Sequence, residues 1–181
     1  MSDVNEIPIH FVCTPQQAAQ LLAEHDAFYL RTCGCRERGQ RHVDNNVCLW
    51  FSTQYLQENA YSKEITADDA TTLLQRAQAE GWVIRPFRDF ETHTIVTGIC
   101  FCCACCCSYF KDGMQEKCEK GACIEQTDMA QCNDCGLCVP ACLFRARSMQ
   151  NGKLVVNRDH CYGCGICQEA CPTEAIRMNS K

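Results

Sequence analysis

Two helical patterns stand out among the apolar positions of the first 98 residues. The first begins at Thr14, which can cap a helix with Pro15 at its first position, and its apolar face continues to about residue 25. The second begins at Thr66 and ends at Gly81, and its apolar side chains recur at the i, i+3, i+4, i+7 spacing of one helix face: Ala70, Leu73, Leu74 and Ala77. Each pattern predicts an amphipathic helix.

Two short apolar runs after the second helix predict strands, at residues 82–84 and 94–96, joined by a polar segment at 88–91. A helix followed by a hairpin is also the arrangement of a winged-helix DNA-binding protein. This helix, however, offers Arg76 as its only base beside three acidic side chains, whereas a recognition helix needs Lys and Arg for phosphates and base edges. Residues 1–98 are therefore expected to form an α+β packing scaffold that binds no nucleic acid.

The last third of the chain repeats one cysteine pattern, C-x2-C-x2-C-x3-C, with a period of 29 residues. Three thiolates spaced two residues apart must wrap around one compact inorganic core, whereas a zinc site uses two C-x2-C pairs separated by a longer insert. In each half the Cys-rich loop runs into a short helical turn and then a strand, such as residues 153–156. The spacing predicts iron–sulfur clusters and hence electron transfer.

Residues 128–181 resemble a bacterial-type dicluster (2×[4Fe–4S]) ferredoxin over their full length, although Leu143 stands where the first run would usually have Pro. The resemblance implies a small ferredoxin fold whose two clusters each take one ligand from the other run. Each cluster would then link both halves of the segment, which is too small to form an apolar core that stabilises it without metal. The implied ligands are Cys132, Cys135, Cys138 and the distant Cys171 for cluster 1, and Cys161, Cys164, Cys167 and the distant Cys142 for cluster 2.

Residues 100–107 hold six further cysteines in eight positions. A metallothionein-like chelating strip and a strained redox disulfide are two possible readings. A further iron–sulfur site is favoured, because two overlapping C-x2-C registers are present and remote cysteines can add ligands. The candidate ligands are Cys33, Cys35, Cys48, Cys100, Cys102, Cys103, Cys105, Cys106 and Cys107. His42 could replace a thiolate at such a site, but a solvated loop histidine is the favoured reading.

The N-terminal cysteines also lie in a longer recognisable order. It consists of Leu30-Arg31-Thr32-Cys33-Gly34-Cys35-Arg36, Cys48-Leu49, Ile65-Thr66, Glu80-Gly81 and Ile99 to Cys107. This order resembles a group of uncharacterised ferredoxin-like proteins of anaerobes, in which such a module precedes the same dicluster domain. The resemblance names no activity for the module. Cys13, Cys118 and Cys123 match no cluster spacing, and Cys13 is expected to be a small buried apolar residue.

Composition indicates the cellular compartment in which the chain is expected to function. It has 20 Cys among 181 residues, a net charge of −5, no apolar stretch after Met1 that resembles a signal peptide, and no run of 18 apolar residues. These features favour reduced thiols and metal binding over a secreted disulfide framework. We therefore expect a cytoplasmic protein without a membrane span.

These observations lead to an α+β protein with three parts: a Cys-rich module at 1–110, a linker at 111–127 and a dicluster ferredoxin domain at 128–181. The chain is expected to relay single electrons between redox partner proteins through two [4Fe–4S] clusters and at least one N-terminal iron–sulfur centre. It has no Gly-rich loop for a flavin or nicotinamide. A reductase with an unusual catalytic N-terminal cluster and a cluster-based redox sensor are the alternatives, and no catalytic residue is assigned.

Overall fold

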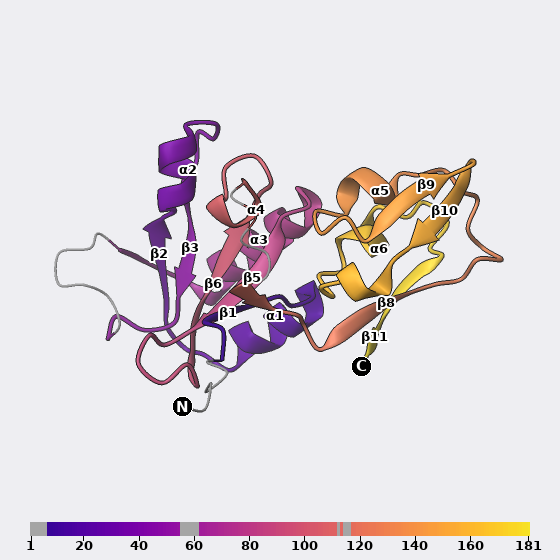
Figure 1. Ribbon diagram of the computed structural model, residues 1–181. Helices are drawn as coiled ribbons and strands as arrows, with labels where there is room; N and C mark the ends of the chain where they lie inside the picture. Colours follow the sequence, from indigo (N-terminus) through magenta and orange to yellow (C-terminus); the bar gives the residue numbers. More distant parts are fainter. Residues whose placement is uncertain (1–6, 55–61, 112, 114–116) are drawn as a thin grey trace, which may run out of the picture.

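A computed structural model describes residues 7–54, 62–111, 113 and 117–181 (Figure 1). Its N-terminal part is built on a seven-stranded sheet with the strand order β4-β2-β3-β6-β5-β1-β7. Neighbouring strands are antiparallel except for β1 and β7, which are parallel. The strands are β1 (His10–Phe11), β2 (Phe28–Thr32), β3 (Asn46–Trp50), β4 (Lys63–Ile65), β5 (Val83–Arg88), β6 (Val96–Cys102) and β7 (Cys118–Glu119).

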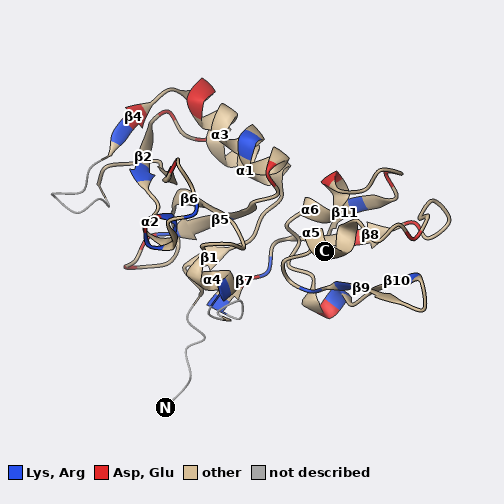
Figure 2. Cartoon of the chain, turned by 90° about the horizontal axis from the view of Figure 1, so that it is seen from above, with Lys and Arg blue, Asp and Glu red and all other residues tan. Residues whose placement is uncertain are grey.

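The two faces of this sheet differ in chemistry. Helices α1 (Pro15–Ala23) and α3 (Ala67–Ala79) pack together over one face, where they bury an apolar core with side chains such as Leu49, Ile99 and Phe101. Figure 2 shows these helices on one side of the sheet and the short helices α2 (Gly34–Gly39) and α4 (Ser108–Lys111) on the other. Because side chains alternate along a strand, the residues between the core positions point to the second face.

Both predicted helices are confirmed, including their starts. Thr14 and Thr66 each cap their helix, and Gln17 and Asp69 reach back to the capping residues to complete two capping boxes. The strand predicted at residues 82–84 is present as β5, which begins at Val83 and continues to Arg88. The predicted strand at 94–96 is misplaced, because β6 begins at Val96 and continues into the cysteine motif.

The C-terminal part consists of two small antiparallel pairs, β9 with β10 and β8 with β11, which flank two short helices. The elements are β8 (Cys123–Thr127), α5 (Cys138–Ala141), β9 (Arg147–Gln150), β10 (Lys153–Val156), the 3-10 turn η2 (Arg158–His160), α6 (Ile166–Glu169) and β11 (Ile176–Ser180). This is a mixed α+β fold of the predicted kind. Strands β7 and β8 lie in the segment 111–127 that the sequence describes as a linker, while the domain boundaries themselves stay a prediction.

The two parts of the chain share a buried cluster of side chains. Val12, Val83 and Tyr109 of the N-terminal part pack in it with Phe144 and Tyr162 of the C-terminal part. Apolar and aromatic side chains therefore join the large sheet to the ferredoxin-like repeats, and cysteines from both parts border this cluster.

Candidate metal centres

The cysteines of the C-terminal repeat fall into two groups in the structure. Cys132, Cys135, Cys138 and Cys171 line one small pocket together with Leu154 and Ile176. Two of these thiols lie in the loop before α5, Cys138 is the first residue of α5, and Cys171 comes from the end of the second repeat. Gly136 has a φ of 74° inside this loop, a conformation that favours glycine.

The second group is Cys142, Cys161, Cys164 and Cys167. Burial raises the pKa of Cys164 to about 12, and the neighbouring thiols of this group contribute to that rise. Cys142 and Cys164 also border the buried cluster that joins the two parts of the chain. The first group therefore lies nearer the outer surface, where Cys135 is exposed, and the second lies against the N-terminal part.

A buried ion pair stands beside these thiols. Arg147 bonds with Glu125, and the two side chains are each only 1% exposed. The same guanidinium donates to Thr127 Oγ1 at 2.9 Å and to Cys138 Sγ at 3.4 Å. Arg147 thus places a positive charge next to a thiol of the first group, and a hydrogen bond to sulfur is a means of tuning a cluster's reduction potential.

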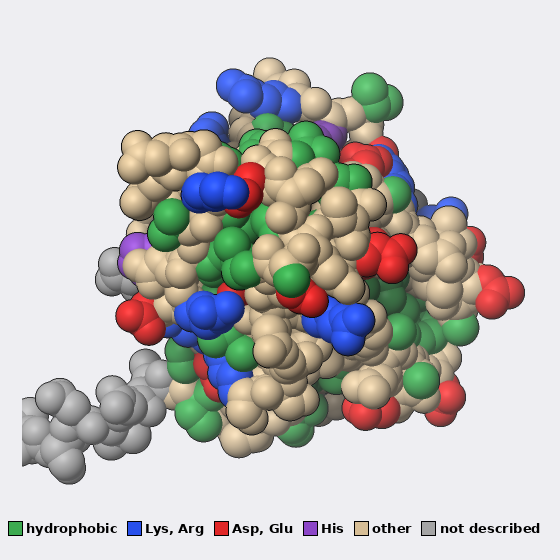
Figure 3. All heavy atoms as spheres, turned by 90° about the vertical axis from the view of Figure 1, so that its right-hand side faces the viewer, with side chains coloured by type: hydrophobic (Ala, Val, Ile, Leu, Met, Phe, Trp, Pro, Cys, Tyr) green, Lys and Arg blue, Asp and Glu red, His purple; other side chains and the backbone are tan. Residues whose placement is uncertain are grey.

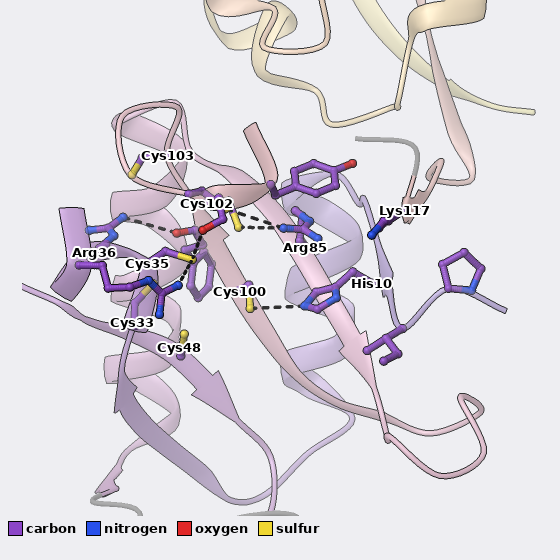
Figure 4. Close-up of a pocket in the computed structure, with 18 of the residues that line it drawn as sticks. His10, Cys33, Cys35, Arg36, Cys48, Arg85, Cys100, Cys102, Cys103 and Lys117 are labelled. Carbon is purple, nitrogen blue, oxygen red and sulfur yellow. Dashed lines mark hydrogen bonds between the residues drawn. The ribbon is translucent and has the colours of Figure 1, made fainter. Parts of the chain in front are cut away.

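A cavity of about 1050 Å³ opens on the sheet face that the α1–α3 layer leaves free. Cys48 and Cys100 lie opposite each other on β3 and β6, and Cys102 follows two positions later on the same face of β6. The start of α2 adds Cys33 and Cys35, and the turn before α4 adds Cys107. Figure 4 shows the sulfur atoms of Cys33, Cys35, Cys48, Cys100 and Cys102 converging on one space.

Several thiols that line the cavity are hydrogen-bonded to one another. Cys48 donates to its neighbours, which lowers the pKa of Cys33 and of Cys100 and raises that of Cys48. Cys102 and Cys107 form a similar pair, in which the pKa of Cys107 is lowered. Because the thiolate is the metal-binding form of cysteine, the cavity is lined with groups suited to a soft metal.

Two buried arginines flank the same cavity. Arg36 is 1% exposed and stacks on Trp82 at 3.8 Å, and Arg85 is 7% exposed and stacks on Tyr109 at 3.6 Å. Within the described part of the chain neither forms an ion pair with a carboxylate. Arg85 Nη1 instead donates to Cys102 Sγ at 3.5 Å. A buried cation needs a negative partner, and a thiolate-ligated iron–sulfur cluster would supply one.

The remaining cysteines of the motif form a separate group with a histidine. The ligand atoms of His42, Cys103, Cys105 and Cys106 all lie within 4.8 Å of one another. His42 Nε2 is 3.0 Å from Cys105 Sγ and 3.3 Å from Cys103 Sγ. His42 is a half-buried loop residue in contact with two thiols, so its role as a metal ligand stays a prediction. Of the nine candidate cysteines of the N-terminal part, Cys105 and Cys106 belong to this group alone, Cys103 belongs to this group and also lines the cavity, and the other six line the cavity.

The three unassigned cysteines have different surroundings. Cys13 is 2% exposed in the core, as expected of a small apolar residue. Cys118 packs in the shared buried cluster, where burial and a hydrogen bond with Cys118 raise the pKa of Tyr109. Cys123 lies on β8 opposite Ser180. No spacing rule could have singled out Cys118, because strand β7 alone brings it beside the cavity.

Comparison with known proteins identifies the C-terminal part. Residues 131–175 match the family model of the 4Fe-4S dicluster domain. A domain of this kind implies two 4Fe-4S clusters, and the two groups of four thiols fit that number. A search of curated proteins finds no match to the chain. In the part of the chain that the structure describes, no helix has the length and apolar character of a membrane span.

Proposed function

We propose that this chain is an iron–sulfur electron-transfer protein that relays single electrons between two C-terminal [4Fe–4S] clusters and at least one N-terminal iron–sulfur centre. One observation carries the proposal: thiols of the N-terminal cavity and thiols of the dicluster domain border the same buried cluster of side chains. Bound clusters would supply one-electron chemistry, while the protein residues hold them, exclude water and set their charge environment.

The ligands proposed for the dicluster domain are those expected from the repeat. Cluster 1 would take Cys132, Cys135, Cys138 and Cys171, which is supported by their shared pocket. Cluster 2 would take Cys142, Cys161, Cys164 and Cys167, which is supported by their mutual electrostatic influence. All 20 cysteines of the chain are free thiols, so none of these ligands is held in a disulfide.

The N-terminal centre would use the thiols on the free face of the sheet. Seven candidates line the cavity: Cys33, Cys35, Cys48, Cys100, Cys102, Cys103 and Cys107. Cys103 also lies beside His42, so the other six are the ligands proposed for this centre. The fit rests on the donor set and on the two buried arginines, whose charges need an anionic neighbour. His10 adds a further polar group, with Nε2 3.9 Å from Cys100 Sγ. These residues would fix the centre and offset its negative charge.

Aromatic side chains fill the space between the cavity and the second C-terminal group. Tyr109 lies next to Phe110 with ring centroids 4.9 Å apart, and Phe110 lies 5.5 Å from Phe144. Phe144 in turn stacks on Tyr162 at 4.2 Å. This packing keeps water out of the space between the two sets of thiols and holds them in a fixed arrangement.

The outer end of the dicluster domain is the proposed docking site for redox partners. Leu137, in the loop of the first thiol group, is 55% exposed, and Met149 beside that loop is 38% exposed. Figure 3 shows hydrophobic side chains on this end of the molecule among scattered positive and negative charges. A small apolar area with mixed charges suits the weak, transient contacts of electron-transfer proteins.

Iron and acid-labile sulfide per chain, measured after anaerobic purification, test the proposal. About eight irons would confine the clusters to the dicluster domain and refute an N-terminal centre, whereas about twelve or more support it, since each cubane has four irons. Cys100→Ala should lower the iron and sulfide content by about one cluster. Cys13→Ala removes a core cysteine that is not among the proposed ligands and should leave the content unchanged.

The size and charge of the cavity favour one alternative, a reductase that admits a substrate to its N-terminal centre. The cavity exceeds the usual volume of small-ligand pockets, and Arg38 and Lys117 add positive charge to its wall. An accessible iron should change its electron paramagnetic resonance signal when cyanide or another small ligand is added. An unchanged signal would support the electron carrier.

A further inference from the structure

The cysteines at the end of β6 point to two different sides of the molecule. Cys100, Cys102 and Cys107 contact the buried cluster that borders the cavity. Cys103 and Cys106 instead belong to the apolar core under α3, with Cys105 packed against it. The strand ends at Cys102, and the following turn carries the next thiols to the other side. Cys105 and Cys106 therefore lie away from the cavity, and Cys103 lies between the cavity and this second set of thiols.

The second set is completed by a histidine from the segment between α2 and β3. Trp82 contacts the edge of the His42 ring, with centroids 6.5 Å apart. Asp44, two residues later, forms an ion pair with Arg76 of α3 at 2.7 Å. Gly39 lies so close to Cys106 that an added Cβ would be 2.7 Å from its sulfur. The end of α2 and the segment that follows it therefore lie directly against the three thiols.

We propose that His42, Cys103, Cys105 and Cys106 bind a single zinc ion, separate from the iron–sulfur centres. A Cys₃His set is a common closed zinc site, with Zn–S near 2.3 Å and Zn–N near 2.0–2.1 Å. In a tetrahedron with such bonds, neighbouring ligand atoms are about 3.8 Å apart or slightly less. The four ligand atoms here lie within 4.8 Å of one another, so small side-chain adjustments suffice to bind one ion.

The same compactness argues against a cubane at this position. A [4Fe–4S] cluster takes its four ligands on four different irons, which keeps the ligand sulfurs farther apart than on one ion. Cys105 Sγ lies only 3.2 Å from Cys103 Sγ. Four protein ligands leave no open coordination position, so the ion would be structural.

The site would join the turn after β6 to the segment before β3. It borders a groove that Trp82 and Ala79 line on one side and Pro140 and Ile166 of the dicluster domain line on the other. Zinc would therefore fix the direction in which the chain leaves β6, and with it the positions of Cys102 and Cys107 in the cavity. The zinc ion would affect the electron-transfer centre only by holding these two cysteines in position.

The test begins with the wild-type protein, purified anaerobically from medium that supplies both iron and zinc. We expect about one zinc per chain, with an X-ray absorption spectrum of three sulfurs near 2.3 Å and one nitrogen near 2.0–2.1 Å. Absence of zinc, or a zinc shell with four sulfurs and no nitrogen, would overturn the proposal. This measurement needs no variant and so does not depend on whether a variant folds.

Variants then assign the residues. His42→Ala should lose the zinc and keep its sulfide content, whereas His42→Cys should keep the zinc with a fourth sulfur in its shell. His25→Ala, which removes a histidine that stacks on Phe51 and is not part of the proposed zinc site, should change neither value. Cys100→Ala should lower iron and leave zinc. If His42→Ala loses iron and sulfide instead of zinc, the four residues belong to an iron–sulfur cluster and the zinc site is refuted.

The test of the zinc site can fail or succeed independently of the electron-transfer proposal. An iron count near eight with one zinc present would refute the N-terminal iron–sulfur centre and retain the zinc site.

Discussion

Arg147 offers a direct way to test whether the protein environment tunes the first thiol group. Its guanidinium is buried, bonds to Glu125 and donates to Cys138 Sγ at 3.4 Å. A positive charge at that position stabilises the reduced, more negative form of a cluster bound through Cys138. Arg147→Met removes both the charge and the hydrogen bond while keeping an apolar stem. We expect the reduction potential of that cluster to fall.

The distance sets the scale of the effect. Two unit charges 3.4 Å apart interact by about 5 kcal/mol at an effective dielectric constant of about 20. For one electron this energy corresponds to about 0.2 V. It is an upper limit, because the added electron spreads over the cluster and Glu125 already offsets part of the Arg147 charge. We therefore expect a decrease of about 50–100 mV.

Redox titration followed by electron paramagnetic resonance, under anaerobic conditions, measures the potential. Arg158→Met is the matched control, because Arg158 contacts the same Glu125 at 3.0 Å but is 52% exposed and has no contact with a cysteine sulfur among the described residues. The control should shift the potential by less than about 20 mV. An unchanged or higher potential in Arg147→Met, with iron content intact, would refute the electrostatic argument.

Three further predictions concern the N-terminal fold. Leu74→Ala should lower the free energy of unfolding by about 2–5 kcal/mol, because Leu74 lies on the buried face of α3. Gln75→Ala, at the exposed neighbouring position, should have little effect in the same denaturant titration. Gly98→Ala should lower the thermal midpoint or prevent folding, because the new Cβ would collide with the Phe87 ring and the adjacent strand; a wild-type midpoint would show that the sheet can shift there. Burial lowers the pKa of His25, so the unfolded state binds the proton more readily and stability should decrease as pH falls below about 6.5. Thermal midpoints between about pH 5.5 and 7.5 should show a flatter profile for His25→Gln, and equal slopes would contradict this assignment.

The helices could be predicted because their signals are local. Thr14 and Thr66 each form capping-box hydrogen bonds with the residue three positions later, so four consecutive residues determine where each helix begins. The same is true of the repeated cysteine loops, in which three thiols lie within seven residues. For these parts, no knowledge of the rest of the fold was needed.

The grouping of the N-terminal cysteines could not be predicted in this way. Spacing alone placed Cys100, Cys103 and Cys106 in one register, which assumes that they share a loop. In the structure Cys100 lies on strand β6, whereas the other two follow its end and pack in the core under α3, and of these two only Cys103 also lines the cavity. Their partners depend on strand register, such as Cys48 opposite Cys100, and on the segment that carries His42.

The register of β3 and β6 has a consequence for how the protein matures. In the dicluster domain, three of the four thiols of each group lie within seven consecutive residues, so a short loop brings them together. In the N-terminal cavity, Cys33 and Cys100 meet only after the sheet has closed a long chain loop, which is a slow step in folding. A metal centre in the cavity would therefore require a chain whose sheet is already paired.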